Sequence, residues 1–229
     1  MCFSATASFA TSAALLPAGI YCIRSAAARN RDYLALAAVP VVFSAQQACE
    51  GLVWVGLGRN DPVLARAASL WFLLFALVFW PFWTPFSTML IEPRRRVRAA
   101  LGAVAAAALA VSLLIYVPLA VHAREWLHTG ILHHSIRYEF EALPLFRGIP
   151  RTAWQVSYLA VVFTSLIVPG NRKLTVFGIL LVASAALSHA AYWYAFLSVW
   201  CAFSAVLSAW LCYLFATLPE GRKQGGAAG

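Results

Sequence analysis

Charged residues are scarce in this chain of 229 residues. Asp, Glu, Lys and Arg account for 11% of it and apolar residues for 62%, whereas an average soluble domain is about 25% charged. The mean hydropathy is +0.78. So few charged side chains cannot form the polar surface that a soluble protein of this size needs. The composition therefore excludes a soluble globular enzyme, a disordered chain and a nucleic-acid-binding domain, despite the net charge of +9; no nucleic acid is expected among the partners.

Sequence motifs of metal and thiol chemistry are missing as well. The chain has no His-Glu-x-x-His motif, and none of its five cysteines forms a Cys-x-x-Cys unit. These are the spacings that usually identify zinc and dithiol sites from sequence. Any metal site must therefore be assembled from residues that are distant in the chain.

Long apolar runs are abundant. A helix needs about 20 mostly apolar residues to cross roughly 30 Å of hydrocarbon. The sequence predicts an all-α integral membrane bundle of seven transmembrane helices. They are expected over residues 9–22, 34–57, 67–91, 99–121, 154–169, 174–193 and 195–217.

Basic residues predict the orientation of this bundle. They concentrate in alternate connectors, and such connectors are typically cytoplasmic. The N-terminus is then outside and the C-terminus in the cytoplasm. The residues concerned are Arg24, Arg29, Arg31, Arg94, Arg95, Arg96, Arg98, Arg172, Lys173, Arg222 and Lys223. We expect one transmembrane domain over 1–219, with an external loop at 122–152 and a disordered cytoplasmic tail at 220–229.

One carboxylate lies inside a predicted span. Glu50 shares a helical face with Gln46 and Gln47, because residues three and four apart are neighbours on a helix. An ionisable residue in a membrane costs several kcal/mol unless it is paired, and it is a functional candidate by default. The alternative is a polar cluster that only holds helices together.

His189 is the only histidine inside a predicted span, and it lies at a depth similar to that of Glu50. We expect the two to face each other in a polar pocket that opens outward, with Glu50 and His189 as a catalytic acid and base. The alternative for His189 is an interfacial residue bonded to a backbone carbonyl. With His134 from the external loop, they would form a ligand set that suits zinc.

Aromatic residues surround two prolines at 79–86. Pro81 and Pro85 should bend their helix and free backbone carbonyls. The aromatic side chains could then line a cavity for an isoprenoid or acyl chain, and plain helix distortion is the alternative.

Four segments carry a resemblance to a known family. They read MCFSATASF at 1–9, QQACEGLVW at 46–54, WP at 80–81 and SVWC at 198–201. The chain resembles an uncharacterised, domain-of-unknown-function family of bacterial multi-pass membrane proteins that begin MCFSA-x-ASF. The resemblance implies a bacterial inner membrane location and no particular reaction. Together with the polar and aromatic positions above, it marks as candidates for ligand binding Cys2, Ser4, Gln46, Gln47, Trp80, Tyr138, Trp200 and Cys201.

Three functions remain open from the sequence. The first is a membrane-embedded enzyme that acts on a lipid or isoprenoid by acid/base or metal-assisted chemistry. The second is a non-catalytic sensor or small-ligand-binding protein that uses the same pocket. A proton or metal carrier ranks third, because the inner halves of the spans supply no carboxylate or imidazole for a path to the cytoplasm.

Overall fold

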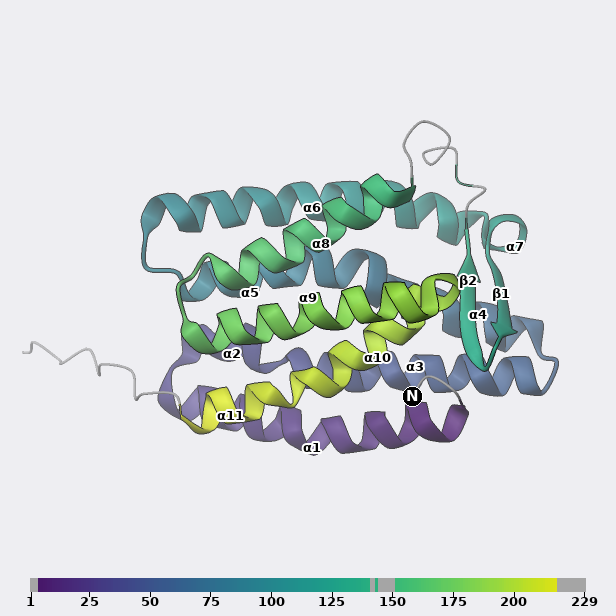
Figure 1. Ribbon diagram of the computed structural model, residues 1–229, viewed down its shortest axis with the longest axis horizontal. Helices are drawn as coiled ribbons and strands as arrows, with labels where there is room; N and C mark the ends of the chain where they lie inside the picture. The colour runs from purple at the N-terminus through teal and green to yellow at the C-terminus, as the bar shows by residue number, and fades with distance from the viewer. Residues whose placement is uncertain (1–3, 141–142, 144–150, 218–229) are drawn as a thin grey trace, which may run out of the picture.

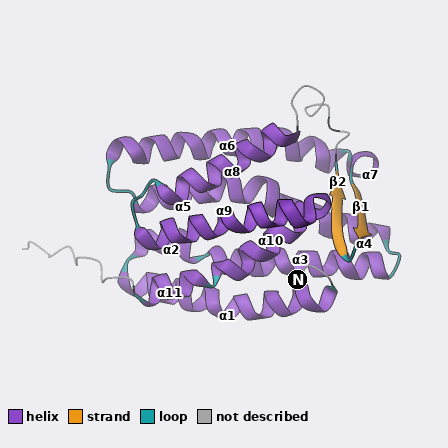
Figure 2. Ribbon diagram, viewed as in Figure 1, coloured by secondary structure: helices purple, strands orange, loops and turns teal. Residues whose placement is uncertain are grey.

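The chain is mostly helical. The computed structural model describes residues 4–140, 143 and 151–217. Its helices run side by side along one axis (Figure 1), and its short strands lie at one end of the bundle (Figure 2). The elements are α1 (Ala5–Arg29), η1 (Arg31–Tyr33), α2 (Leu34–Ala37), α3 (Val39–Gly58), α4 (Pro62–Leu73), η2 (Leu74–Phe79), α5 (Trp80–Ile91), α6 (Arg95–Val121), α7 (Ala123–Trp126), β1 (His128–Leu132), β2 (Ser135–Glu139), α8 (Arg151–Ile167), α9 (Arg172–Tyr192), η4 (Trp193–Ala195), α10 (Phe196–Ser208) and α11 (Trp210–Ala216).

Five helical stretches in the described chain are long and apolar enough to cross a membrane. They are Ala5–Arg29, Arg31–Gly58, Pro62–Ile91, Arg95–Val121 and Arg172–Ala216. The last stretch covers α9, α10 and α11, and α10 folds back along α9 (Figure 1). A shorter apolar helix occupies Ala153–Ile167. These long apolar stretches confirm the prediction of a multi-pass helical membrane protein.

The first helix is longer than expected. The sequence predicted a first span at 9–22, whereas α1 covers Ala5–Arg29. Its start is fixed by Ser4, whose hydroxyl accepts a hydrogen bond from the backbone N–H of Ala7 at 3.2 Å, which is the preferred cap of a helix N-terminus. Ser4 therefore has a clear structural role at the start of α1.

The two ends of the bundle differ in composition. The α1–η1, α5–α6 and α8–α9 connections lie at one end (Figure 1), and they carry Arg29 and Arg31, Arg94 and Arg95, and Lys173. We call this the basic end. The α3–α4 connection, α7 and the two strands lie at the opposite end, which we call the hairpin end.

The segment expected as an external loop is folded in part. β1 and β2 pair antiparallel, with Leu132 opposite Ser135. His133 and His134 form the two-residue turn, both with positive φ, 46° and 59°, as a type I′ hairpin turn requires. The side chain of Ile136, in β2, is fully buried. The ring of Tyr138 stacks on Phe72 of α4 at 4.8 Å, so the hairpin is docked on the bundle.

A π-helical turn precedes the proline pair. In η2 the backbone N–H of Trp80 reaches the carbonyl of Phe75, five residues back. Pro81 has no N–H, so the regular ladder cannot continue through it. Such turns widen a helix locally and are frequent at functional sites. The predicted distortion of this helix is therefore present, just before Trp80-Pro81.

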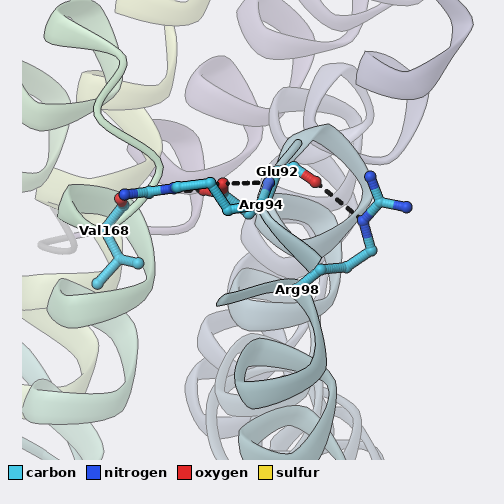
Figure 3. A network of polar contacts seen from close by, with 4 residues as sticks. All are labelled: Glu92, Arg94, Arg98 and Val168. Atoms are coloured by element: carbon cyan, nitrogen blue, oxygen red, sulfur yellow. Dashed lines mark hydrogen bonds and ion pairs between the residues drawn. The ribbon is translucent and has the colours of Figure 1, made fainter. Parts of the chain in front are cut away.

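An ion pair closes the basic end (Figure 3). The guanidinium of Arg94 donates to both carboxylate oxygens of Glu92, at 2.7 and 3.0 Å, and to the carbonyl of Val168 after α8, at 2.6 Å. Arg98 donates to the backbone carbonyl of Glu92 at 2.9 Å. The hydrogen bonds from Arg94 hold the pKa of the Glu92 carboxyl down at about 2. This network ties the α5–α6 connection to the end of α8.

The first and last described helices also meet near the basic end. The sulfur atoms of Cys22 in α1 and Cys212 in α11 are 3.4 Å apart, and the Ser25 hydroxyl donates to the carbonyl of Phe215 at 2.8 Å. Both thiols are free. The spacing of the cysteines in the sequence gave no indication of this contact.

Candidate functional site

A buried polar cluster lies between α3 and α10. Gln46, Gln47 and Glu50 of α3 are 0%, 1% and 0% exposed. The hydroxyl of Ser198, in the first turn of α10, donates to Oε1 of Glu50 at 2.5 Å. This hydrogen bond is shorter than the usual distance of about 2.7–2.8 Å between a hydroxyl and an oxygen acceptor. The predicted shared face of Gln46, Gln47 and Glu50 therefore points into the protein and meets α10.

Trp80 joins this cluster from α5. Its indole N–H donates to Oε1 of Gln46 at 2.7 Å, and its ring stacks on Phe43 at 4.0 Å. The thiol of Cys201 lies beside Gln46 and Glu50. The Gln47 side-chain amide nitrogen has no hydrogen-bond partner within the described ranges. Three helices that are distant in sequence thus contribute polar groups to one interior position.

His189 does not take part in this cluster. It is exposed on α9, where its ring edge contacts Phe196 at 5.8 Å. The expectation that Glu50 and His189 face each other is wrong. Similar depth does not make two side chains face each other, because facing also depends on the angle around the helix. The buried stripe of α9 includes Leu181, Ser184 and Ser188, and His189 lies about 100° away from Ser188.

The expected zinc ligands are not brought together either. His134 is exposed at the hairpin turn, His189 is exposed on α9, and Glu50 is in the interior. Across residues 4–140, 143 and 151–217 there is no group of three His, Cys, Asp or Glu side chains that could hold a metal ion. The described residues therefore do not fit a zinc site. Cys2 and the tail 220–229 lie outside the described residues.

The helices also leave a large cavity, which none of the residues of this cluster lines. Its volume is about 750 Å³, and it lies between α6, α8, the η2–α5 helix and the start of α10. This is within the range of about 300–1,000 Å³ that holds one small molecule. α6 packs along α5 much more extensively than on α8, which leaves room for the cavity. We call it the outer cavity.

The lining of the outer cavity is mainly apolar, with polar groups near one end. α6 contributes Val104, Ala108 and Val111. Gln155 lies near the start of α8, and Tyr138 comes from the hairpin. Both of these residues lie toward the hairpin end. The cavity thus has a polar end and an apolar body, which matches a molecule with a polar head and an apolar chain.

A second cavity of about 40 Å³ lies deeper in the bundle. We call it the inner cavity. Trp80 and Cys201 line it, as does Ser204, whose hydroxyl has no hydrogen-bond partner in the described part of the chain. Tyr158 and Trp200 line both cavities. Of the predicted ligand-binding residues, Tyr138 and Trp200 therefore border the outer cavity, and Trp80, Trp200 and Cys201 the inner one.

Sequence reasoning missed several residues at these sites. Tyr158 and Gln155 were taken only as part of an apolar span. Their hydroxyl and amide groups in an otherwise apolar helix were the available signal. Ser198 was noticed only within the SVWC segment, and its contact with Glu50 depends on how α3 and α10 pack.

These features define a class and a family. The long apolar helices make the chain a multi-pass membrane protein. It matches, over residues 1–224, the model of a family of unknown function, DUF6629, and belongs to that family. Comparisons with curated proteins and with solved structures found no match.

Proposed function

We propose that the protein spans the bacterial plasma membrane seven times, with the N-terminus outside and the C-terminus in the cytoplasm. The stretch Arg172–Ala216 has 45 residues, about twice the length that one crossing needs, and it turns back at η4. α8 has 17 residues, the lower limit for a crossing. Three arginine- or lysine-bearing connections gather at the basic end, which supports placing that end in the cytoplasm.

Labelling from outside intact cells tests this orientation. In a background without native cysteines, a cysteine at the hairpin turn, His134→Cys, should react with a membrane-impermeant maleimide. The matched variant Arg95→Cys, at the basic end, should react only after the cells are opened. The reverse pattern would invert the orientation.

The geometry favours a ligand-binding protein, and we propose that it holds one lipid or isoprenoid molecule in the outer cavity. The observation that carries this proposal is the 750 Å³ cavity, with an apolar body and polar groups at the hairpin end. The hydrocarbon chain would lie along α6 and α8, and the head would lie near Gln155 and Tyr138. This orientation matches that of a lipid in the outer leaflet when the hairpin end is outside.

Native mass spectrometry tests the proposal. Protein extracted with mild detergent should retain one lipid per chain. Ala108→Trp places an indole inside the outer cavity and should reduce the bound fraction by about tenfold or more, which corresponds to a loss of at least ~1.4 kcal/mol. Ala106→Trp adds the same side chain at an exposed position of α6 that does not line the cavity, and it should retain the lipid. Equal retention by both variants would contradict the proposal.

A membrane-embedded enzyme is the second candidate. The observation that favours it is the 2.5 Å hydrogen bond from Ser198 to the buried carboxylate of Glu50. Glu50 is fully buried and lines neither cavity, so this candidate requires the reacting group of the substrate to reach the α3–α10 contact, where Glu50 would exchange a proton with it. Glu50→Gln keeps the size and removes the ionisable group, so turnover of the co-purified lipid should be lost while lipid binding persists. Full turnover by a folded Glu50→Gln protein would remove this candidate.

A further inference from the structure

The described lining of the outer cavity is polar in places but carries no charge. Among the described residues, its polar members are Ser, Gln, Tyr and Trp, and none is Asp, Glu, Lys, Arg or His. A charged head that left water for such a site would lose its hydration without gaining a counter-ion, which is strongly unfavourable. The described lining therefore favours a ligand whose head is polar and uncharged.

The charged residues beside Tyr138 do not change this. Arg137 and Glu139 flank Tyr138 on β2 and pair with each other at 2.8 Å. Successive side chains of a strand point to opposite faces, and the burial of β2 follows this alternation, since Tyr138 is buried and its two neighbours are partly exposed. The pair therefore lies on the face of the hairpin opposite to Tyr138, and its two charges neutralise each other.

Aromatic rings form the wall of the outer cavity on the α10 side. Phe196 and Trp200 are one helical turn apart, and their rings stack with 9° between the planes and 5.8 Å between the centroids. The ring of Tyr158 meets that of Trp200 edge to face at 5.7 Å. All three residues line the cavity, and α10 begins at Phe196 near the hairpin end (Figure 1). Such a wall favours a planar ring, which can stack on it or meet it edge to face.

Gln155 places a hydrogen-bonding group beside these rings. It precedes Tyr158 by three residues, so the two side chains share one face of α8, and both line the cavity. The Gln155 amide makes no hydrogen bond to the described part of the chain. An amide can both donate and accept hydrogen bonds, and one that faces an apolar space without a partner is unfavourable. A carbonyl oxygen on the head of a ligand would provide that partner.

We propose that the outer cavity recognises an uncharged head of the quinone type. The planar ring would lie against Phe196 and Trp200, and a ring carbonyl would accept a hydrogen bond from the Gln155 amide. This inference rests on the proposed lipid-binding function and narrows its ligand class to isoprenoid lipids with a neutral ring as the head.

A competition among three ligands that carry the same short isoprenoid chain separates the effect of the head from that of the chain. Full-length protein in detergent, stripped of lipid, is incubated with an equimolar mixture of an isoprenoid benzoquinone, the corresponding isoprenoid alcohol and the monophosphate of that alcohol. Native mass spectrometry gives the bound fraction of each. The quinone should bind best, the alcohol less well because it lacks the ring, and the phosphate least because it is charged.

Two variants test the assigned contacts. Gln155→Leu removes the amide at similar size and should lower the bound fraction of the quinone by about twofold to tenfold, the contribution of one hydrogen bond. Phe196→Leu removes a ring and keeps an apolar side chain, so the preference for the quinone over the alcohol should shrink. Gln155→Leu serves alone if Phe196→Leu does not fold.

Tyr116→Phe is the matched control for the loss of a polar group. The Tyr116 hydroxyl donates to the carbonyl of Leu70 at 3.0 Å, and Tyr116 borders neither cavity. This variant should keep the selectivity of the wild type. A Gln155→Leu protein that binds the quinone as tightly as Tyr116→Phe does would overturn the hydrogen bond assigned to Gln155.

The wild type separates the head from lipid binding as such. A wild type that prefers the phosphate, or that binds the quinone and the alcohol equally, would overturn the quinone-type head and leave lipid binding intact. The same holds if it binds none of the three and still retains a native lipid on mild extraction. A wild type that binds none of the three and retains no native lipid would overturn both proposals.

Discussion

The two ends of the bundle are built differently. At the basic end, Arg94 joins Glu92 to the end of α8, and α1 contacts α11 through Cys22 and Cys212. Nearer the hairpin end, an open cavity of about 750 Å³ lies between the helices, and the Glu50–Ser198 pair lies in the interior. Direct contacts close the first region, whereas the second has space for another molecule. Under the proposed lipid-binding function, the basic end would hold the helices together and the other region would carry the ligand.

The largest expected effect is on the docking of the hairpin. Ile136→Ala removes a fully buried side chain and should destabilise the docked hairpin by about 2–5 kcal/mol, the usual cost of such a cavity. Hydrogen exchange of the β1–β2 amides measures this local stability. Ile131, which pairs with Ile136 on the other strand, is 49% exposed. Ile131→Ala should change the exchange little, and equal effects would show that the hairpin is not docked through Ile136.

The second largest effect is expected from the hydrogen bond between Ser198 and Glu50. Ser198→Ala removes a donor to Glu50 and should lower the free energy of unfolding by about 1–3 kcal/mol, the cost of removing one partner of a buried polar group. Ser184→Ala is the control, because among the described residues the Ser184 hydroxyl donates only to a carbonyl of its own helix, that of Leu181. Thermal unfolding in detergent compares the two. A larger loss in Ser184→Ala would contradict the assigned importance of the α3–α10 contact.

The ion pair between Glu92 and Arg94 at the basic end should contribute less to the free energy of unfolding. Glu92→Gln should cost about 1 kcal/mol, equivalent to a fall in Tm of roughly 2–4 °C. Because the pKa of Glu92 in the folded protein, about 2, lies below its ordinary value of 4.5, its contribution to stability is present above pH 4.5 and is lost as the pH falls toward 2. The difference in Tm between wild type and Glu92→Gln should therefore shrink over that range. A difference that grows on acidification would contradict the pairing.

The smallest perturbation tests the contact of the first and last helices. Copper phenanthroline should convert the Cys22 and Cys212 thiols to a disulfide, because their sulfur atoms are 3.4 Å apart. A closed loop between these cysteines should migrate faster in a non-reducing gel. Cys22→Ser should abolish the shift, whereas Cys49→Ser should not. Persistence of both thiols under oxidation, with the same treatment linking an engineered pair elsewhere, would contradict the contact.

The sequence indicated where residues lie along their helices, but it did not indicate which neighbouring helix each side chain faces. Apolar runs located the helices, and the three- and four-residue spacing placed Gln46, Gln47 and Glu50 on one face. The partner of that face could not be read, because it is Ser198, 148 residues away in the chain. His189 was misplaced for the same reason: depth is set by the number of residues, but facing is set by the packing of α9 against α10.

The cavities lay beyond sequence reasoning altogether. Pro81 and the aromatic residues around it indicated a distorted helix with a possible cavity. Whether that distortion leaves a space depends on how closely α6 and α8 approach, and no local pattern encodes this distance. The hairpin was missed because two histidines form its turn, whereas Asn-Gly or Asp-Gly is the usual signal.

The most direct test of lipid binding is an experimental density map of the wild-type protein purified with its native lipids. We predict a single elongated density between α6 and α8, with its wider end near Gln155 and Tyr138 and its narrow end toward Val104 of α6. A map in which side chains fill the outer cavity, or in which that space is empty while annular lipids are visible outside, would contradict the account.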